Sequence, residues 1–403
     1  MRVLFTPLAW PSHLFPMVPL AWACRAAGHE VQVAAQPPVI DAITGAGLTA
    51  VSVGESYDLN DAIANLHQQA QEAGWTRSID EVRAMSADER RRFIALRSLP
   101  HVKAAEAMAD DLVAFVRWWR PDLIVTDPVV LAAPLAAGVA GIPLVRHLWG
   151  LDLTRRAAFP RGGDTRDQWP EELFLLFDRY DVHLRADFAD FGVRTVDPCP
   201  ASIQFPGVPH RLPVRHVPYN GTGITPPWLA QPARRRRVCV TWGTSTTRLI
   251  GAAGFLVPGI LTALASLDAD VVIAVKKADR GLLGALPDGM RVTEDLPLSL
   301  LLPACDAIIH QGGFGTMIAA ARYGLPQVIL AVLTDQATNA ERLASTGAGI
   351  YLPPGQAGPD AIKTAMSAIL SDDAPREAAR HIREEILAQP APAAIVATLE
   401  ELC

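Results

Sequence analysis

The stretch His310–Thr316, which reads HQGGFGT, decides the fold of this chain because it combines a glycine-rich turn with the start of a helix. The apolar run Ala307–Ile309 before it is typical of a short buried strand, and Met317–Tyr323 after it is typical of a helix that ends at Gly324. Glycines allow a sharp turn that exposes backbone N–H groups, and a helix N-terminus adds unpaired donors and partial positive charge. This arrangement suits a phosphate or diphosphate, with His310 as a further donor, although a tight turn without a ligand is the alternative.

Strand-like and helix-like segments alternate along the chain, which predicts parallel sheets covered by helices on both faces. The first strand is expected at Arg2–Thr6, and the pattern restarts at Val238–Thr241 after a proline-rich region between Asp197 and Pro232. Such proline density forbids a continuous helix or a central strand. A chain of 403 residues also exceeds what one hydrophobic core usually holds. We therefore predict an α/β protein with two Rossmann-like domains that face a cleft.

The domain boundaries follow from the same pattern. We place the N-terminal domain at residues 1–210, a proline-rich linker at 211–236, the C-terminal domain at 237–385 and a final helical segment at 386–403. Ligands of open parallel sheets lie beyond the carboxyl ends of the strands. Each domain is therefore expected to contribute one substrate site to the cleft.

Composition narrows the classes of partner. A net charge of −6 and a pI near 5.9 argue against a general nucleic-acid binder. Five cysteines without metal-type spacing favour reduced thiols and a cytoplasmic protein, and a strand that begins at Arg2 leaves no room for a signal peptide. The apolar stretch Pro128–Val145 is broken by prolines and glycines, so we expect a packed helix and strand there rather than a membrane span. No metal-ligand cluster is visible, and the motifs of dehydrogenases, P-loop NTPases and GxSxG hydrolases are missing.

Three loops of the second half are expected at carboxyl ends of strands, where they can converge on one ligand. Trp242–Thr246 offers hydroxyls and N–H groups, and Thr334–Asn339 offers a carboxylate and an amide beside the turn at His310–Thr316. A diphosphate site with a sugar-hydroxyl clamp explains the three loops better than unrelated turns do, because Asp and Gln side chains both accept and donate. Asp335 alone could equally cap a helix. The segment Glu294–Leu298 follows a strand and could supply backbone groups that read a nucleotide base.

The first half offers a histidine and a carboxylate at corresponding places. His13 lies in the connection between the first strand and the helix that follows it, and we expect its side chain to point into the cleft. Imidazole can accept a proton from a hydroxyl near neutral pH. Asp127 is expected at a carboxyl strand end of the same sheet, where it could orient His13 or contact an acceptor. The alternatives are a polar residue at a helix start for His13 and a turn former before Pro128 for Asp127.

At these residues the chain resembles the family 1 glycosyltransferases of the GT-B fold. It is most similar to the bacterial enzymes that attach deoxysugars to polyketide antibiotics. The resemblance spans the chain and is strongest over Arg2–Val53 and Ile308–Leu352, and Val217–Gly221 in the linker is typical of that group. It implies a metal-independent enzyme with no cofactor besides its dTDP-sugar donor. It also implies that a final helix, at Ile395–Leu402, crosses back to the N-terminal, acceptor-binding domain.

The family pattern also implies a role for each motif. His13 would be the catalytic base, with Asp127 beside it. The turn would hold the donor diphosphate through His310, Gly313, Gly315 and Thr316, and the hydroxyl residues Thr244 and Ser245 would close over it. The backbone at Leu296 would read the base. The carboxylate of Asp335 and the amide of Gln336 would hold the sugar. The chain departs from many relatives at Ser12, where they have glycine, and at Gln311, where a second histidine often occurs.

We therefore expect an inverting transfer of a deoxysugar from a dTDP-sugar to an apolar polyketide-type aglycone, at oxygen or carbon. The regions Leu59–Leu96 and Trp149–Trp169 are expected to line the acceptor side, although their aromatic residues could belong to the core. These aromatic residues are Trp75, Phe93, Trp149, Phe159 and Trp169. Relatives of this type include enzymes that need a helper protein, and a helper and a homodimer both stay open. The alternatives are a nucleotide-sugar epimerase of the same fold and a non-catalytic partner of another transferase.

Overall fold

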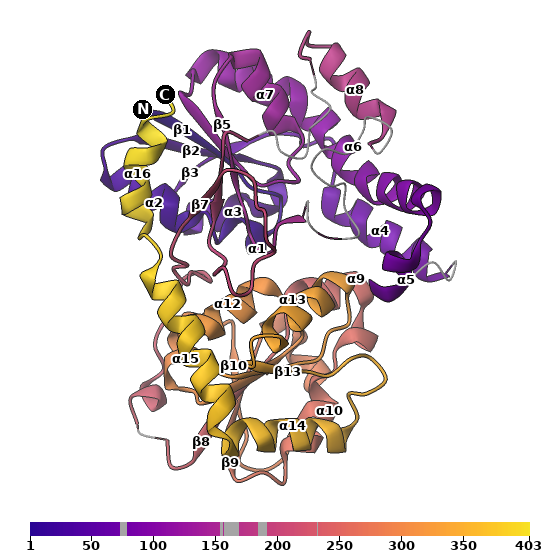
Figure 1. Ribbon diagram of the computed structural model, residues 1–403, viewed down its shortest axis with the longest axis vertical. Helices are drawn as coiled ribbons and strands as arrows, with labels where there is room; N and C mark the ends of the chain where they lie inside the picture. Colours follow the sequence, from indigo (N-terminus) through magenta and orange to yellow (C-terminus); the bar gives the residue numbers. More distant parts are fainter. Residues whose placement is uncertain (73–78, 154–155, 157–168, 184–191, 232) are drawn as a thin grey trace.

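Two domains, each built on one parallel β-sheet, make up the computed structural model (Figure 1). The structure describes residues 1–72, 79–153, 156, 169–183, 192–231 and 233–403. Every strand pair in both sheets is parallel. The predicted α/β architecture of two Rossmann-like domains is confirmed.

The N-terminal sheet has the strand order β3-β2-β1-β4-β5-β6-β7. Its strands are β1 Arg2–Thr6, β2 Glu30–Ala35, β3 Thr49–Ser52, β4 Leu123–Thr126, β5 Leu144–His147, β6 Arg194–Asp197 and β7 Arg211–Pro213. Successive side chains of a strand point to opposite faces, so Val3 and Phe5 pack in one buried cluster and Leu4 packs in another. Both faces of the sheet are thus covered, which is why its central strands are apolar throughout.

The helices of this domain cover both faces of the sheet. They are α1 Pro11–Leu14, α2 Val18–Ala26, α3 Ile40–Gly45, α4 Leu59–Glu72, α5 Ile79–Ala84, α6 Ala87–Trp119, α7 Ala132–Ala140 and α8 Glu171–Asp178. The longest, α6, begins with a capping box between Ser86 and Glu89. The apolar stretch Pro128–Val145 forms α7 and the start of β5, as expected. Within the described ranges, no helix has the length and apolar character that a membrane span requires.

The C-terminal sheet has the strand order β10-β9-β8-β11-β12-β13. Its strands are β8 Arg236–Thr241, β9 Ala269–Val275, β10 Arg291–Glu294, β11 Ala307–His310, β12 Gln327–Ile329 and β13 Gly349–Tyr351. The α-helices of the second half are α9 Thr244–Ile250, α10 Val257–Leu264, α11 Leu298–Leu301, α12 Phe314–Arg322, α13 Thr334–Ala344, α14 Pro359–Ser371, α15 Asp373–Ala388 and α16 Pro392–Glu400. Short 3-10 helices are η1 Pro37–Val39, η5 Pro227–Ala230, η6 Ala252–Gly254, η7 Lys277–Leu283 and η8 Leu302–Ala304.

The last two helices join the domains. In Figure 1, α15 lies along the C-terminal domain and α16 runs on to the N-terminal domain, where both chain ends lie. Ile395, Val396 and Leu399 of α16 are buried in the same cluster as Val18 and Leu20 of α2. The final helix is therefore part of the N-terminal core.

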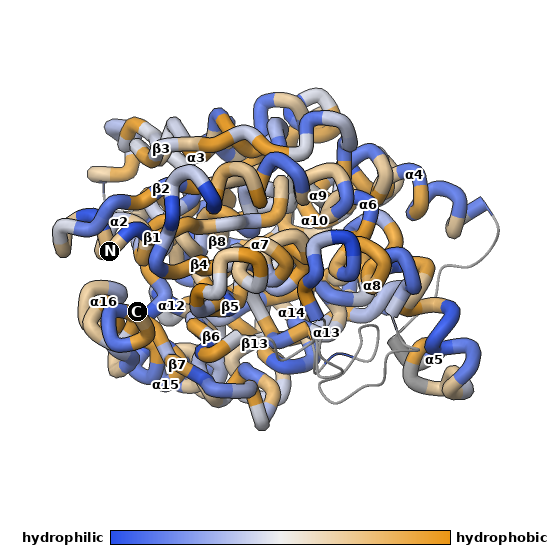
Figure 2. Tube along the Cα trace, turned by 90° about the horizontal axis from the view of Figure 1, so that it is seen from above, coloured by the Kyte–Doolittle hydropathy of each residue, from blue (hydrophilic) through white to orange (hydrophobic). Residues whose placement is uncertain are grey.

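The proline-rich region contains more structure than its composition predicts. Strand β7 pairs with β6, so the N-terminal sheet extends to Pro213, inside the segment assigned to the linker. Between β7 and β8, the described residues form only the 3-10 helix η5, which agrees with the proline density. Figure 2 shows hydrophobic positions concentrated along the central strands and the helices against them. Each sheet has its own buried clusters, and a further cluster joins Leu151, Cys199 and Ile203 of the first domain to residues around Phe314 and Met317 of the second.

Candidate active site

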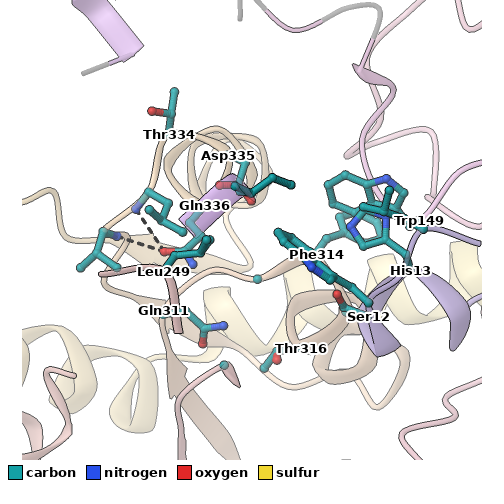
Figure 3. A pocket seen from close by; sticks show the side chains of 18 of the residues that line it. Ser12, His13, Trp149, Leu249, Gln311, Phe314, Thr316, Thr334, Asp335 and Gln336 are labelled. Carbon is teal, nitrogen blue, oxygen red and sulfur yellow. Dashed lines mark hydrogen bonds between the residues drawn. The ribbon is translucent and has the colours of Figure 1, made fainter. Parts of the chain in front are cut away.

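A cavity of about 1670 Å³ lies between the two domains and is lined by both of them. The N-terminal domain contributes residues that follow β1 and β5, such as His13 and Trp149, and the C-terminal domain contributes Gln311 and Asp335. Figure 3 shows His13 and Trp149 on one side of this space and Gln311, Asp335 and Gln336 on the other. Pockets for one small ligand usually measure about 300–1,000 Å³. The cavity is therefore large enough for two substrates.

His13 and Asp127 meet at the N-terminal wall. The nitrogen Nδ1 of His13 lies 2.6 Å from Oδ2 of Asp127, and the carboxylate is fully buried. The other oxygen, Oδ1, accepts the backbone N–H of Val129 at 3.0 Å. A carboxylate only accepts hydrogen bonds, so Nδ1 carries the proton and Nε2 is left as the basic nitrogen. The pair that the sequence placed at two strand ends is thus brought into direct contact.

Aromatic rings and a short helix fix the orientation of the His13 imidazole. His13 lies in α1, and this helix begins at Pro11, because proline is suited to the first helical position. The ring centroid of Trp149 lies 4.3 Å from that of His13, and Trp10 meets His13 edge-on at 5.5 Å. The ring therefore has little freedom, and it is held at the cavity wall.

The glycine-rich turn has the geometry that the sequence predicts. Gly312 has a φ of +92°, in the region that favours glycine. A Cβ there would lie 2.9 Å from Cγ2 of Ile329 and 3.0 Å from the carbonyl oxygen of Gln336. Gly313 precedes α12, which begins at Phe314 rather than at Met317. Gly313, Gly315 and Thr316 line the cavity, so the first turn of α12 faces the space where an anion could lie.

His310 does not contact the cavity as expected. Its ring is fully buried, Nε2 bonds to Oε1 of Gln327 at 2.8 Å, and Nδ1 accepts the backbone N–H of Gly312 at 3.0 Å. Burial lowers the pKa of the imidazole to about 4, so the ring is neutral near pH 7. The expectation that His310 offers a donor to the diphosphate is therefore wrong. Its role is to hold the turn in shape.

Gln311 takes the place that the sequence assigned to His310. Its side chain is buried at the cavity wall, and its Oε1 has no hydrogen-bond partner. A Cβ at Gly313 would lie 2.8 Å from its Nε2, and a Cβ at Gly243 would also collide with it. Two glycines thus make room for this amide. In the sequence, Gln311 lies beside three glycines. That pattern indicates the turn, but it does not indicate that Gln311 is the side chain that lines the cavity.

Asp335 and Gln336 begin α13 and line the cavity, but they are not equivalent. Oε1 of Gln336 accepts the backbone N–H groups of Val332 and Leu333 at 3.1 and 3.2 Å, and its Nε2 donates to Oγ1 of Thr246 at 2.8 Å. The amide oxygen expected to hold a sugar is therefore already in use, which corrects that expectation. Asp335, which caps no helix end in this structure, is the member of the pair left for a ligand.

The remaining donor positions differ in how far the structure describes them. The backbones of Thr244 and Ser245 form the first turn of α9, whereas their side chains lie outside the described part of the chain. Leu296 lines the cavity beside Asp295, whose φ is +50° and whose carboxylate pairs with Lys276 at 3.3 Å. The segment expected to read a base is thus at the cavity wall.

Known proteins of the same size and fold match this chain along its whole length. A 10-deoxymethynolide desosaminyltransferase of Streptomyces venezuelae is 38% identical over 415 residues, which cover 100% of this chain and 97% of the relative. The solved structure of the spinosyn rhamnosyltransferase SpnG complexed with thymidine diphosphate has a TM-score of 0.81 at 32% identity, and the match covers 99% of this chain and 100% of SpnG. The structure of SpnG complexed with spinosyn aglycone has a TM-score of 0.81 at 31% identity, and the match covers 99% of this chain and 100% of SpnG.

Two family models match successive parts of the chain, and the first match extends past β8 of the second sheet. The N-terminal domain of erythromycin biosynthesis protein CIII-like proteins matches residues 22–243, and the C-terminal domain matches residues 259–402. The chain belongs to the erythromycin biosynthesis protein CIII-like family of glycosyltransferases. The predicted resemblance to GT-B enzymes of antibiotic deoxysugar transfer is thereby confirmed.

The N-terminal wall of the cavity in this glycosyltransferase carries many apolar side chains beside charged ones such as Glu89, Arg92 and Arg97. Phe93 and Trp149 line the cavity, as do Ile63, Leu66 and Met85 of α4 and the chain before α6. Trp169 packs against the N-terminal core cluster, which is the alternative considered for these aromatic residues. The remaining two aromatic residues of that prediction, at positions 75 and 159, lie outside the described residues.

No group of three or more His, Cys, Asp or Glu side chains in the described part of the glycosyltransferase is arranged to hold a metal ion. Its cysteines Cys24, Cys199, Cys239, Cys305 and Cys403 are unpaired thiols. The polar side chains that line the cavity carry amide, hydroxyl, carboxylate, imidazole, guanidinium, ammonium and indole groups.

Proposed function

We propose that this enzyme transfers a deoxysugar from a dTDP-sugar to an apolar polyketide-type aglycone, with inversion at the anomeric carbon and with His13 as the base. The observation that carries this proposal is that a buried His–Asp pair and a glycine-rich helix start face each other across one cavity. Such a site can deprotonate a hydroxyl on one side and receive a diphosphate on the other.

The reaction follows from these two walls. Nε2 of His13 takes the proton of the acceptor hydroxyl while its oxygen attacks the anomeric carbon. The bond from that carbon to the diphosphate oxygen breaks on the opposite face, and the bonding electrons leave with the diphosphate. Asp127 stabilises the imidazolium that forms, through the bond to Nδ1. N–H groups at the start of α12 stabilise the charge that grows on the leaving group.

The donor assignment draws on the relatives. SpnG binds thymidine diphosphate in a chain of nearly the same size and fold. In the present enzyme, Gln311, Gly313, Gly315 and Thr316 line the cavity with amide, backbone and hydroxyl donors, and Asp335 lines it with a carboxylate that we assign to the sugar hydroxyls. We propose that the donor binds without a metal ion, because these groups can carry the diphosphate charge.

The acceptor assignment rests on the apolar wall. A nucleotide-sugar epimerase needs no second substrate site, whereas this cavity continues past His13 to Ile63, Leu66 and Phe93. Burial of apolar surface contributes roughly 25 cal/mol per Å², so this wall favours a large apolar aglycone. SpnG has been solved with its spinosyn aglycone, and we infer that the same region receives the acceptor here.

Replacement of His13 by alanine tests this function. We expect transfer from a dTDP-deoxysugar to hydroxyl acceptors to slow by about 10²–10⁴-fold, because general-base assistance is lost. Calorimetric affinity for thymidine diphosphate is expected to stay within about twofold of the unchanged enzyme. His183→Ala, at an exposed histidine, is the matched control. An unchanged transfer rate in His13→Ala would show that another group is the base.

A further inference from the structure

We propose that Arg156, which belongs to the N-terminal domain, binds the donor diphosphate and neutralises part of its charge. This inference rests on the proposed function, because it requires a diphosphate donor in the cavity. It assigns the main cationic contact of the donor to the domain opposite the one that carries the glycine-rich turn.

The first observation is a buried cation with unused donors. The Arg156 side chain lines the cavity and is 5% exposed, yet its Nε and Nη1 have no hydrogen-bond partner. Among the described residues, the guanidinium has one hydrogen-bond partner, since its Nη2 donates to Oδ1 of Asn339 at 3.3 Å. A guanidinium has five N–H donors, and a buried charge without compensation is costly. An anion that enters the cavity would accept hydrogen bonds from the unused N–H donors and would compensate the buried positive charge.

The second observation is the place of the guanidinium. Asn339, which receives the Arg156 bond, donates its own Nδ2 to the carbonyl oxygen of Gly312 at 2.9 Å. One amide side chain therefore separates Arg156 from the glycine-rich turn. On its other side, the guanidinium lies 5.4 Å from the centroid of the Trp149 ring, which contacts His13. Arg156 is thus between the base and the turn that would receive the leaving group.

The third observation is the charge of the donor wall. The turn at residues 310–316 contains no lysine or arginine, and its His310 is buried and neutral. The basic side chains among the described cavity residues are Arg92, Arg97 and Arg156 from the N-terminal domain and Lys276 from the C-terminal domain. Lys276 already pairs with Asp295, and Arg92 and Arg97 are exposed. Arg156 is the member of this group with a buried charge, where hydrogen bonds to an anion are strongest.

The surrounding carboxylates keep the group cationic without occupying it. Burial lowers the pKa of the Arg156 guanidinium, whereas Asp335 and Asp152 raise it. Arginine stays protonated in proteins near neutral pH. A bound diphosphate would therefore meet a positive charge and Asp335 would remain available for the sugar hydroxyls.

Calorimetry with thymidine diphosphate and with thymidine tests the assignment. In Arg156→Met, which keeps the apolar stem, we expect the affinity for thymidine diphosphate to fall by about 10- to 100-fold, because a charge-assisted contact is lost. Affinity for thymidine should stay within about twofold. Arg156→Lys, which keeps the charge, should give an intermediate loss and provides the answer if the methionine variant does not fold.

Arg342→Met is the matched control. Arg342 lies on α13 like Asn339, and it bonds across the domains to the carbonyl oxygens of Ile203 and Gln204 at 2.7 and 2.9 Å. The Arg342→Met variant should have weaker contact between the domains and an unchanged affinity for thymidine diphosphate. Equal affinity in Arg156→Met and the unchanged enzyme would overturn the assignment, as would equal losses for both ligands. If the unchanged enzyme does not bind thymidine diphosphate, the proposed function itself is wrong.

Discussion

At the scale of single residues, the chemistry of the site depends on which nitrogen of His13 holds a proton. Asp127 accepts from Nδ1, so Nε2 has a free lone pair. The carboxylate is itself held by the N–H of Val129, and no side chain rotation can move it without breaking that bond. Replacement of one carboxylate oxygen of Asp127 by an amide nitrogen should therefore lower the rate of transfer more than it lowers the affinity for thymidine diphosphate.

Replacement of Asp127 by asparagine tests this tautomer argument. An asparagine amide can donate to Nδ1, which would move the proton to Nε2 and remove the basic lone pair from the cavity. We expect kcat to fall by about 10²–10⁴-fold, with thymidine diphosphate affinity within about twofold. Steady-state kinetics and calorimetry together give this comparison. A variant with normal kcat would mean that the carboxylate has only a structural role.

Residue detail was also where prediction from sequence was least complete. The sequence places both His310 and Gln311 at the end of a strand, and the strand pleat sends adjacent side chains to opposite sides. Nothing in the local pattern says which side is the cavity. The family pattern favoured the histidine, whereas the structure buries His310 against Gln327 and leaves Gln311 at the wall. His13 and Asp127 were predictable because each follows an apolar strand.

At the scale of elements, the strand, turn and helix at β11 and α12 form one unit held by His310 and Gln327. Gln327 accepts from His310 and donates to the carbonyl oxygen of Met317 in α12 at 3.0 Å. The turn is thus tied to strand β12 on one side and to its own helix on the other. A diphosphate would meet N–H groups that are already in place, which is the preorganised arrangement that electrostatic catalysis requires.

Gly312→Ala tests how much the turn depends on its backbone. Alanine is disfavoured at a φ of +92°, and its Cβ would approach Ile329 and the Gln336 carbonyl. We expect the free energy of unfolding to fall by about 1–3 kcal/mol and thymidine diphosphate to bind more weakly. Denaturant unfolding and calorimetry measure both effects. Gly259→Ala is the control, because this exposed position in α10 has open space around it and should gain about 0.5–1 kcal/mol.

Elements with a clear apolar run were predictable, and those without one were not. Strands β1, β8 and β11 form where their apolar runs predict them, although β8 begins earlier and β11 ends later than expected, because nearly all of their residues are buried. Strand β7 contains Pro213, and β13 contains Gly349; both lie at sheet edges, where few residues must be apolar. Their pairing is decided by neighbouring strands rather than by local sequence.

At the scale of the whole molecule, the site exists only where the two domains meet. His13 comes from one domain and the glycine-rich turn from the other, and Arg156 and Arg342 of opposite domains bond across the boundary. The domains are also joined by α16, whose Leu399 is buried in the N-terminal core. In the proposed donor site, Arg156 approaches the diphosphate from the domain opposite the one that carries the glycine-rich turn. Sequence composition predicts two domains and a cleft, but it does not predict which side chains cross it.

Acid sensitivity is a second property of the whole molecule. Burial lowers the pKa of His101, His147 and His310 to about 4 and that of His216 to about 3. In the unfolded chain these groups titrate near about 6.5, so the unfolded state binds more protons between these values. The free energy of unfolding is therefore at its full value above about pH 6.5 and decreases as the pH falls toward 4.

The size of this effect is large compared with the stability of a folded protein. A histidine pKa lowered from about 6.5 to about 4 corresponds to roughly 3 kcal/mol, and the lower pKa of His216 corresponds to more. The four together are comparable with the total of about 5–15 kcal/mol typical of a domain. We therefore expect the enzyme to unfold before pH 4, as monitored by circular dichroism and denaturant titration at each pH. His147→Gln removes one of these groups, so the loss of stability between pH 6.5 and 4 should be smaller in that variant. An equal pH dependence in both proteins would contradict the lowered pKa of His147, because a group that binds its proton equally well before and after unfolding contributes no slope.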